Sequence, residues 1–461
     1  MNRSFIYKII SILILIALMA IAVGFVNGII LERQQRQFEA RASISQTASR
    51  AQTVVGPVLA ISYVDEYAET IITDNQPQSF TRSYKGKVYL FPEELSLKGG
   101  FVNEVKSLGI YKALIFQLGG NINGQFKIPK NLGLKLANEH SAIKITDAYL
   151  SVGITDTKGL SGKPILKWAD QTTTFKQGSK IDALNNGIHA PINIVNTNDE
   201  QKIAFEFKLN LRGTESFNFT PIAENNAIAL SSSWQSPRFY GGFSPDAATQ
   251  KIGADGFSAN WAITSLSSNN QAALMQIIHT GNAANQTLES LSVGFVEPIN
   301  VYSQADRATK YGLLFIGLTF AGFFIFEVLK QLRIHPAQYT FVGLAMALFY
   351  LLLVSLAEQI GFAYAYLAAS TACVGLLAYY LSYVLKSKFN GLLFASLLTA
   401  LYGALYGILA SEDNALVMGS LLVFGLLALV MIITRKVDWY QISGKDAQVN
   451  PVQSHSTYDV V

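Results

Sequence analysis

The side chains that most often carry catalysis are scattered along this sequence. Its five histidines are far apart: His140, His189, His279, His335 and His455. No HExxH pair predicts a helical zinc site, and the sequence also lacks a G-x-S-x-G elbow, a P-loop and a dinucleotide fingerprint. The adjacent acids Asp65-Glu66 and Glu93-Glu94 would point to opposite faces of a strand, so neither pair forms a dyad by itself. We therefore expect no catalytic residue, no cofactor, no metal site and no enzyme activity.

Three residues beside apolar runs are the candidate functional positions. Glu327 and His335 lie in FEVLKQLRIHPAQY, residues 326–339, and Glu358 ends the next apolar run. An acid within a membrane segment is by default a candidate for a coupling or relay role. The alternative is structural, because Glu327 lies three residues before Lys330 and could pair with it or extend to the membrane interface. We favour the structural interpretation of Glu327.

Charge is unevenly distributed along the 461 residues. Only 14% of them are charged, against about 25% in an ordinary soluble protein. Residues 311–434 hold just eight charged side chains: Glu327, Lys330, Arg333, Glu358, Lys386, Lys388, Glu412 and Asp413. The net charge of +4 is small for this length and predicts no nucleic-acid partner. One part of the chain thus has a membrane protein's composition, and the rest has a soluble protein's.

Six apolar segments are long enough to cross a bilayer, whose hydrocarbon core needs about 20 residues. We expect spans at residues 9–30, 312–329, 339–357, 361–385, 391–410 and 415–434. The first is longer than a signal-peptide core of roughly 7–15 residues and shows no convincing cleavage site, so residues 1–30 are interpreted as an uncleaved anchor. The other five form a bundle, residues 311–434, and a polar tail follows at 435–461.

Some short loops between the spans carry bases and others carry acids, and this difference predicts the orientation of the spans. Lys330 and Arg333 lie in one connection and Lys386 and Lys388 in another, whereas the connections near Glu358 and at 411–414 carry acids only. Positive charge in short loops stays on the cytoplasmic side. Both termini are therefore expected in the cytoplasm, and residues 31–310 outside the membrane.

The inserted region, residues 31–310, is predicted to be β-rich after a helical stalk that Gly56-Pro57 would end. In IAFEFKLNLRG, apolar residues alternate with polar ones from Ile203 to Leu211, as in a strand with one buried face. KVYLFP, IYKALIFQL, AYLSVGI and FSANWAI are further strand candidates, separated by turns at GGNING, TDTKGLSG and RFYGGFSPD. The expected fold is an α+β membrane protein with six transmembrane helices and a large inserted antiparallel β domain, either one sandwich or two packed units.

Two further patterns have both a structural and a functional interpretation. Trp234, Phe239, Tyr240, Phe243 and Trp261 could line a ligand surface, although aromatic residues more often pack in cores and turns. The fifth span has a GxxxG at 403–407, which favours close helix packing, and the fourth has Ser370, Thr371 and Cys373 near its centre. The spans show no acid or base near their centres, which argues against a proton-coupled pump.

Several segments together resemble one family, CreD, of inner-membrane proteins of Gram-negative bacteria. They include RATKYGLLFIGLTFAGFFIFEVL, the hairpin RIHPAQY with the span after it, and VVGPVLAISY, GIHAPI and LRGTESFNFTPI in the inserted domain. The resemblance covers nearly the whole chain except the tail after Gln441. It supplies no catalytic residue and no cofactor.

The resemblance implies a cell-envelope integrity protein, produced under a two-component sensor and regulator that respond to stress. It also implies a link to tolerance of envelope-directed colicins and β-lactams. The expected partners are the lipid bilayer and an unidentified periplasmic component, and the oligomeric state is left open. Two alternatives stay open, a transporter or lipid-handling permease and a membrane enzyme acting on cell-wall intermediates.

Overall fold

The computed structural model describes residues 3–73, 76–135, 142–194, 198–281, 287–295, 300–330, 334–385, 387–411 and 415–435. His140, His455, Arg333, Lys386, the acids at 412–413 and the 436–461 tail therefore lie outside the described residues. The chain divides into two compact units. One, the membrane unit, contains Met1–Arg36 and Ile299–Val461, and the other, the β unit, contains Gln37–Pro298.

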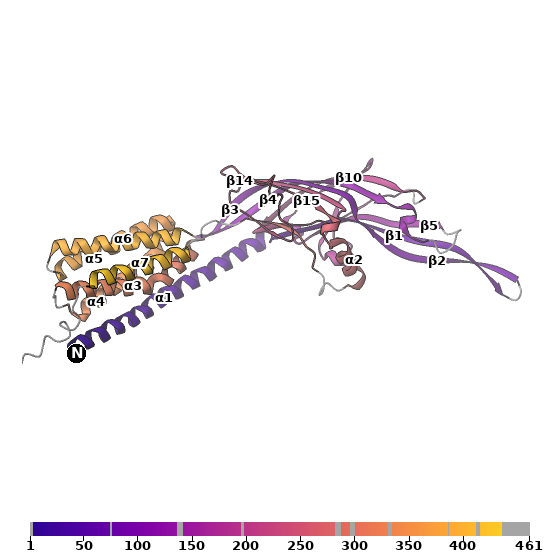
Figure 1. The fold of residues 1–461 in the computed structure, drawn as a ribbon. Coiled ribbons are helices and arrows are strands. Elements are labelled where there is room, and N and C mark those ends of the chain that lie inside the picture. The colour runs from indigo at the N-terminus through magenta and orange to yellow at the C-terminus, as the bar shows by residue number, and fades with distance from the viewer. Residues whose placement is uncertain are drawn as a thin grey trace, which may run out of the picture. The chain divides into compact units, whose positions relative to one another are not determined.

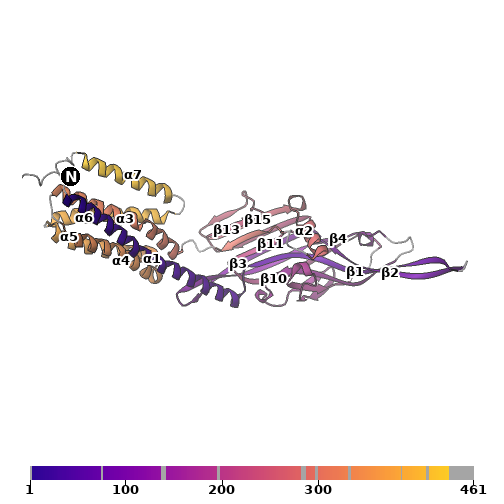
Figure 2. The same ribbon diagram turned by 90° about the horizontal axis from the view of Figure 1, so that it is seen from below.

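Six long helices occupy the positions of the six predicted spans: α1 (Arg3–Ala48), α3 (Val301–Lys330), α4 (Pro336–Ile360), α5 (Phe362–Val384), α6 (Lys388–Ala410) and α7 (Ala415–Thr434). Within the described residues, the first five are long and apolar enough to cross a membrane, and α7 holds a shorter apolar segment, 417–432. Neighbours along the chain pack together from α3 to α7, and α3 also packs on α6 (Figure 2).

Helices of the membrane unit pack closely at Gly343 rather than at the GxxxG pair. A Cβ on Gly343 of α4 would lie 2.8 Å from Met19 Sδ of α1 and from Phe320 Cζ of α3. By contrast, a Cβ on Gly403 would meet nothing within 4 Å, and one on Gly407 would make only an ordinary contact with Met418. Close packing at Gly403 was thus a wrong prediction, because that face of α6 is open.

The β unit contains two sheets of eight strands each. Sheet A has the order β13-β16-β11-β1-β5-β9-β8, with β2 also paired to β1. Its strands are β1 (Gln52–Thr73), β2 (Gln76–Leu90), β5 (Ala142–Ile154), β8 (Lys176–Gln177), β9 (Gly187–Pro191), β11 (Ser216–Thr220), β13 (Pro237–Gly241) and β16 (Leu291–Phe295). The paired β1–β2 ribbon projects beyond the rest of the unit (Figure 1).

Sheet B has the order β14-β15-β12-β3-β4-β10-β6-β7. Its strands are β3 (Pro92–Leu108), β4 (Tyr111–Ile128), β6 (Ile165–Trp168), β7 (Gln171–Thr174), β10 (Gln201–Thr214), β12 (Asn225–Ser232), β14 (Lys251–Gly253) and β15 (Gly256–Thr264). Most pairings in the two sheets are antiparallel, as predicted, but β1–β11 and β3–β12 are parallel. One helix, α2 (Asn270–Thr280), also belongs to this unit.

A single hydrophobic core joins the inner faces of both sheets, so the β unit is one sandwich. Leu150 and Phe217 of sheet A and Phe116 and Phe207 of sheet B are among its buried members. Phenylalanine rings from the two sheets pack edge to face, for example Phe101 and Phe217 with centroids 5.5 Å apart. In β10 the residues at 205, 207, 209 and 211 are buried, which confirms the predicted register.

One predicted helix end and one predicted turn are wrong, and the predicted turn RFYGGFSPD is partly wrong because β13 covers its first four residues. The stalk helix ends at Ala48, where Ser49 takes a positive φ of 85°, and Gly56-Pro57 lies inside β1. GGNING lies within β4, where one of its glycines meets a close neighbour: a Cβ on Gly124 would lie 2.1 Å from the Glu94 carbonyl oxygen. Glycine in a strand interior marks such a close approach as well as a turn. The predicted loop at TDTKGLSG is confirmed and contains a 3₁₀ turn, Thr157–Gly159.

Candidate functional site

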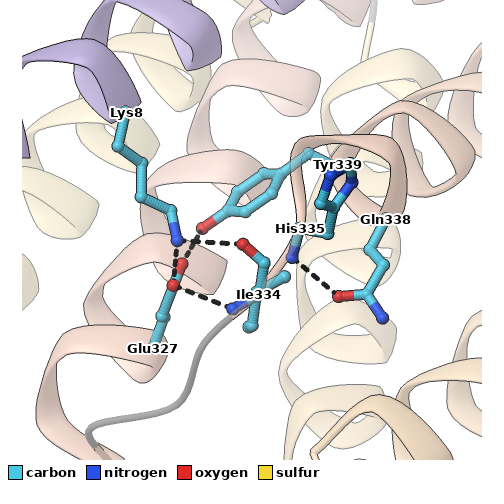
Figure 3. Close-up of polar contacts among 6 residues, drawn as sticks. All are labelled: Lys8, Glu327, Ile334, His335, Gln338 and Tyr339. Carbon is cyan, nitrogen blue, oxygen red and sulfur yellow. Dashed lines mark hydrogen bonds and ion pairs between the residues drawn. The ribbon is translucent and has the colours of Figure 1, made fainter. Parts of the chain in front are cut away.

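The three candidate residues lie in the membrane unit, in two polar clusters at opposite ends of α4. Glu327 and His335 lie near its first residue, and Glu358 lies in its last turn. Figure 3 shows the first group, which we call the Glu327 cluster: Lys8, Glu327, Ile334 and Tyr339.

The Glu327 carboxylate is buried and receives hydrogen bonds from three directions. Its Oε1 accepts from the Lys8 ammonium of α1 and from the Ile334 backbone N–H, the latter at 3.1 Å. Its Oε2 accepts from the Tyr339 hydroxyl of α4 at 2.9 Å. Lys8 also donates to the Ile334 carbonyl oxygen at 3.0 Å. A buried charge is stable only when it is paired and hydrogen-bonded in this way, so the cluster joins α1, α3 and α4.

Aromatic packing fixes the tyrosine of this cluster. The Tyr339 ring lies 4.7 Å from Phe323 and 5.6 Å from Phe320, both on α3. Phe323 in turn packs against Phe394 of α6 at 5.7 Å.

The partner of Glu327 is Lys8, 319 positions away in sequence, rather than Lys330. Pairing with Lys330 was a wrong prediction.

His335 caps the helix that begins beside it. Its Nδ1 accepts from the Ala337 N–H at 3.2 Å, while its own backbone N–H donates to Gln338 Oε1 at 3.0 Å. This is a capping box, and Pro336 occupies the first position of α4, where its missing N–H is no loss. The side chain of His335 is exposed, and its role here is to cap the first turn of α4.

The second group, the Glu358 cluster, contains Arg33, Tyr302 and Glu358. Glu358 Oε1 accepts from the Tyr302 hydroxyl of α3 at 3.0 Å and lies 3.6 Å from Arg33 Nε of α1. Its side chain is only 11% exposed, whereas that of Arg33 is 40% exposed. The same three helices are therefore joined again at this end of the bundle.

The spacing of the two clusters along α1 matches a bilayer. Arg33 follows Lys8 by 25 positions, or ~37 Å at the helical rise, and residues 9–31 between them carry no charge. This separation exceeds the hydrocarbon thickness of ~30 Å and falls short of the full thickness of ~40–45 Å. Each cluster is thus placed at the level of the head groups.

The comparisons with known proteins agree with this arrangement. A family model described as "Inner membrane protein CreD" matches residues 4–440. The Inner membrane protein CreD of Escherichia coli (strain K12) is 30% identical over 438 residues, which cover 95% of this chain and 94% of that protein. The chain belongs to the CreD family.

The family assignment confirms the resemblance noted in the sequence and makes this a multi-pass inner-membrane protein. A solved structure of a presumed nutrient binding protein from Legionella pneumophila covers 50% of this chain and 74% of its own, at 6% identity and a TM-score of 0.24. A likeness that weak carries no argument about fold or function.

In this CreD-family chain, sequence reasoning missed the residues that complete the clusters. Lys8, Arg33, Tyr302 and Tyr339 bind the two acids, yet each is remote in sequence from at least one member of its cluster. The available signal was positional: Lys8 and Arg33 are the first bases on either side of the first apolar run, and Glu327 and Glu358 end two others. Charges at matching depths in a helix bundle are natural partners.

The other candidate groups in the β unit are structural. Glu66 pairs with Lys144 at 2.6 Å and Glu93 with Lys202 at 2.9 Å, and these acids lie on the strands β1 and β3. Trp261 and Phe239 pack together in the core, with centroids 5.7 Å apart, while Tyr240 is exposed. Among the described residues, no group of three or more histidines, cysteines or acids could hold a metal ion.

Tyr149 of β5 is the most perturbed titratable group in the β unit. It is 1% exposed, and its hydroxyl accepts from Lys87 Nζ at 2.7 Å and donates to the Lys180 carbonyl oxygen at 2.9 Å. Burial, with smaller contributions from Asp147 and Asp182, raises the pKa of Tyr149 to about 12. Its hydroxyl therefore stays protonated at neutral pH and connects β2, β5 and the segment before β9.

Proposed function

We propose that this protein maintains cell-envelope integrity by contact, through its β unit, while the membrane unit serves as its anchor. The observation that carries the proposal is the use of the polar groups in the membrane unit. Glu327, Lys8 and Tyr339 satisfy one another at one end, and Glu358, Arg33 and Tyr302 do so at the other. Charges committed to helix pairing are poorly suited to carry a proton or ion through the bilayer.

The same proposal includes an orientation. Residues 31–310 face the periplasm and both termini face the cytoplasm, because Lys330 ends α3 and Lys388 begins α6, each next to a short connection, and positive charge at short connections stays inside. The β unit then meets an unidentified periplasmic component, and the bilayer contacts the helices. No catalytic step and no cofactor is part of this proposal.

Complementation of a strain lacking the protein tests the proposal under challenge by an envelope-directed β-lactam. A chain in which a flexible glycine-serine linker replaces residues 37–298 retains α3 to α7 and the part of α1 that carries Lys8 and Arg33, but loses the β unit. If the β unit acts by contact, this chain should restore no tolerance even though it is inserted, which membrane fractionation checks. Tolerance restored by this shortened chain would contradict the proposal.

One observation favours a second candidate, a lipid-handling protein. The first half of α5 and the second half of α6 border a groove of about 740 Å³ in the apolar part of the chain. Ligand pockets have volumes of about 300–1,000 Å³, so this groove is large enough to hold part of a lipid. An enzyme of cell-wall intermediates has no corresponding support among the described residues.

A further inference from the structure

The groove between α5 and α6 is open because two of its residues have no side chain. Gly375 of α5 and Gly403 of α6 both line it, and a Cβ on either would meet nothing within 4 Å. Glycine in a helix interior is unfavourable by about 1 kcal/mol relative to alanine, so open glycines on facing helices have a cost that close packing does not repay. The space that they leave is available to a ligand.

The length of the groove matches one leaflet of a bilayer. It begins near Tyr364, the third residue of α5, and extends to Gly375, eleven positions later, or ~17 Å along the helix. Half of a hydrocarbon core is ~15 Å. On α6 the lining residues lie between Thr399 and Tyr406, four residues before the helix ends. The groove therefore extends from the membrane interface to about the midplane.

Two of the aliphatic hydroxyls in the groove are hydrogen-bonded within the protein. Ser370 Oγ donates to the Leu367 carbonyl oxygen at 3.2 Å, and Thr399 Oγ1 donates to the Ala395 carbonyl oxygen at 2.9 Å. Because these hydroxyls are bonded within their own helices, a hydrocarbon chain can contact them without breaking a hydrogen bond. The rest of the lining consists of four tyrosines, two glycines, Thr371 and one each of alanine, leucine and valine.

The groove is continuous with the surface that the bilayer contacts. Tyr364 is 72% exposed and Leu367 is 65% exposed, on helices that cross an inner membrane. At its interfacial end, Tyr364 and Tyr406 provide aromatic side chains with hydroxyl groups, the type that gathers at head-group level.

We infer that this groove is a binding site for one acyl chain of a phospholipid, with the head group beside Tyr364 and Tyr406. The acyl chain belongs to a lipid of the leaflet at the Glu358 end of the bundle. Under the orientation of the proposed function, on which this detail alone rests, that is the outer leaflet. A site that ends near the midplane holds a lipid in one leaflet, whereas transfer would require a path through both.

Photocrosslinking of the full chain in lipid nanodiscs tests this inference. The probe is a phosphatidylethanolamine with a diazirine in its acyl chain, mixed into phosphatidylethanolamine and phosphatidylglycerol, and adducts are located by mass spectrometry. We expect adducts concentrated on α5 and α6 in the groove. Gly375→Leu and Gly403→Leu should each lower that yield roughly tenfold, because the new side chain fills the site, a change of about 1.4 kcal/mol in binding.

Gly425→Leu on α7 is the matched control. Gly425 is exposed, its Cβ would also meet nothing within 4 Å, and it does not line the groove. All three substitutions raise helix propensity, so loss of the fold is not expected, and circular dichroism checks this. Equal adduct yields on α5, α6 and α7, or yields unchanged by the two groove substitutions, would show bulk lipid contact only and overturn the inference.

Neither outcome depends on envelope tolerance, so failure of the lipid site and failure of the proposed function are distinguishable.

Tyr364→Phe and Tyr406→Phe extend the test to the head group. A second probe carries the diazirine in its head group. With that probe the double variant should lose adducts near the first turn of α5, whereas the acyl-chain probe should still form adducts near Gly403. Head-group adducts equal to those of the unaltered chain would contradict the assigned head-group position.

Discussion

At the scale of single residues, the acid with the strongest functional expectation is the most completely paired. Glu327 is 5% exposed and accepts from an ammonium, a hydroxyl and a backbone N–H on three elements. A relay residue needs free positions for an incoming proton, and three of the roughly four acceptor sites of this carboxylate are directed at fixed donors. Its environment therefore favours the structural role that the sequence suggested, with a different partner.

His335 gives a residue-scale prediction, because a cap and a proton carrier respond differently to the same substitution. His335→Ala should lower the free energy of unfolding of the membrane unit by about 1 kcal/mol, since the cap of α4 is lost. His335→Asn should keep most of that stability, because asparagine is a good N-cap. Thermal unfolding of the full chain in detergent measures both. Equal destabilisation by the two variants would show that capping is not the role of this side chain.

The residue-scale predictions that held are those with local causes. Proline cannot continue a preceding helix and suits the first position of a new one, and α4 begins at Pro336. The partner of Glu327 could not be read from neighbouring sequence, because Lys8 reaches it only after the bundle has brought α1 beside α3 and α4. An i, i+3 neighbour such as Lys330 is the default in an isolated helix, and tertiary packing overrode it.

At the scale of elements, alternation of apolar and polar residues predicted strands well, whereas a cluster of glycines led to a wrong turn prediction. Alternation along 203–211 gave both the strand β10 and its buried face. GGNING was misassigned because glycine is needed both in turns and where strands meet bulky neighbours. Gly124 faces the Phe205 ring and the Glu94 carbonyl oxygen, contacts that exist only after sheet B has formed.

The register of β10 gives a prediction with a built-in control. Phe207 is 1% exposed in the core, whereas the adjacent Lys208 points to solvent. Phe207→Asp should destabilise the β unit by on the order of 5 kcal/mol, since it buries an unpaired charge and removes an aromatic ring. Lys208→Asp should change stability by less than about 1 kcal/mol. Limited proteolysis of the full chain checks both, and similar sensitivity of the two variants would show that the register is wrong.

Tyr149 makes the stability of the β unit sensitive to alkaline pH. Its pKa is about 12 in the folded chain and near 10 when unfolded, so between these values the unfolded chain loses the proton while the folded chain keeps it. The contribution of Tyr149 to the free energy of unfolding is fully present below pH 10 and falls by roughly 2–3 kcal/mol as the pH approaches 12. Urea unfolding followed by tryptophan fluorescence should show a shallower alkaline decline in Tyr149→Phe. A decline as steep as that of the unaltered chain would contradict the assignment.

At the scale of the whole molecule, the predicted orientation can be read by chemical labelling. With Cys373 replaced by alanine, single cysteines are placed at the exposed positions Ser233 and Lys388 and at Ser454 in the tail. An impermeant maleimide should label only the cysteine at position 233 in intact spheroplasts, since the other two positions are expected inside. Labelling at position 388 under these conditions would reverse the proposed orientation.

The division of the whole chain was accessible from sequence because composition changes sharply between its parts. Uncharged runs of about 20 residues predicted the helices, and alternation predicted the β unit between them. The two polar clusters were inaccessible, because each unites residues from α1, α3 and α4 that only the folded bundle brings together. The groove was inaccessible for the same reason: the GxxxG signal marks a small-residue face without saying whether a helix or a lipid covers it.

The central claim is that the charges of the membrane unit hold helices together while the β unit acts. Replacing the Glu327 cluster by an apolar set of similar shape tests it most directly, with Lys8→Met, Glu327→Met and Tyr339→Phe combined. Removing the three polar side chains together avoids an unpaired buried charge and leaves only the Ile334 backbone N–H and carbonyl oxygen without these partners, and such replacements are often neutral for stability. Glu327→Met alone is the destabilised control.

The measurement is envelope-stress tolerance of a deletion strain that produces the triple variant at the level of the unaltered chain. The contact account predicts tolerance equal to that of the unaltered chain, because the helices stay joined and the β unit is untouched. Loss of tolerance in a correctly inserted triple variant would contradict it and would make Glu327 a coupling residue of a transporter.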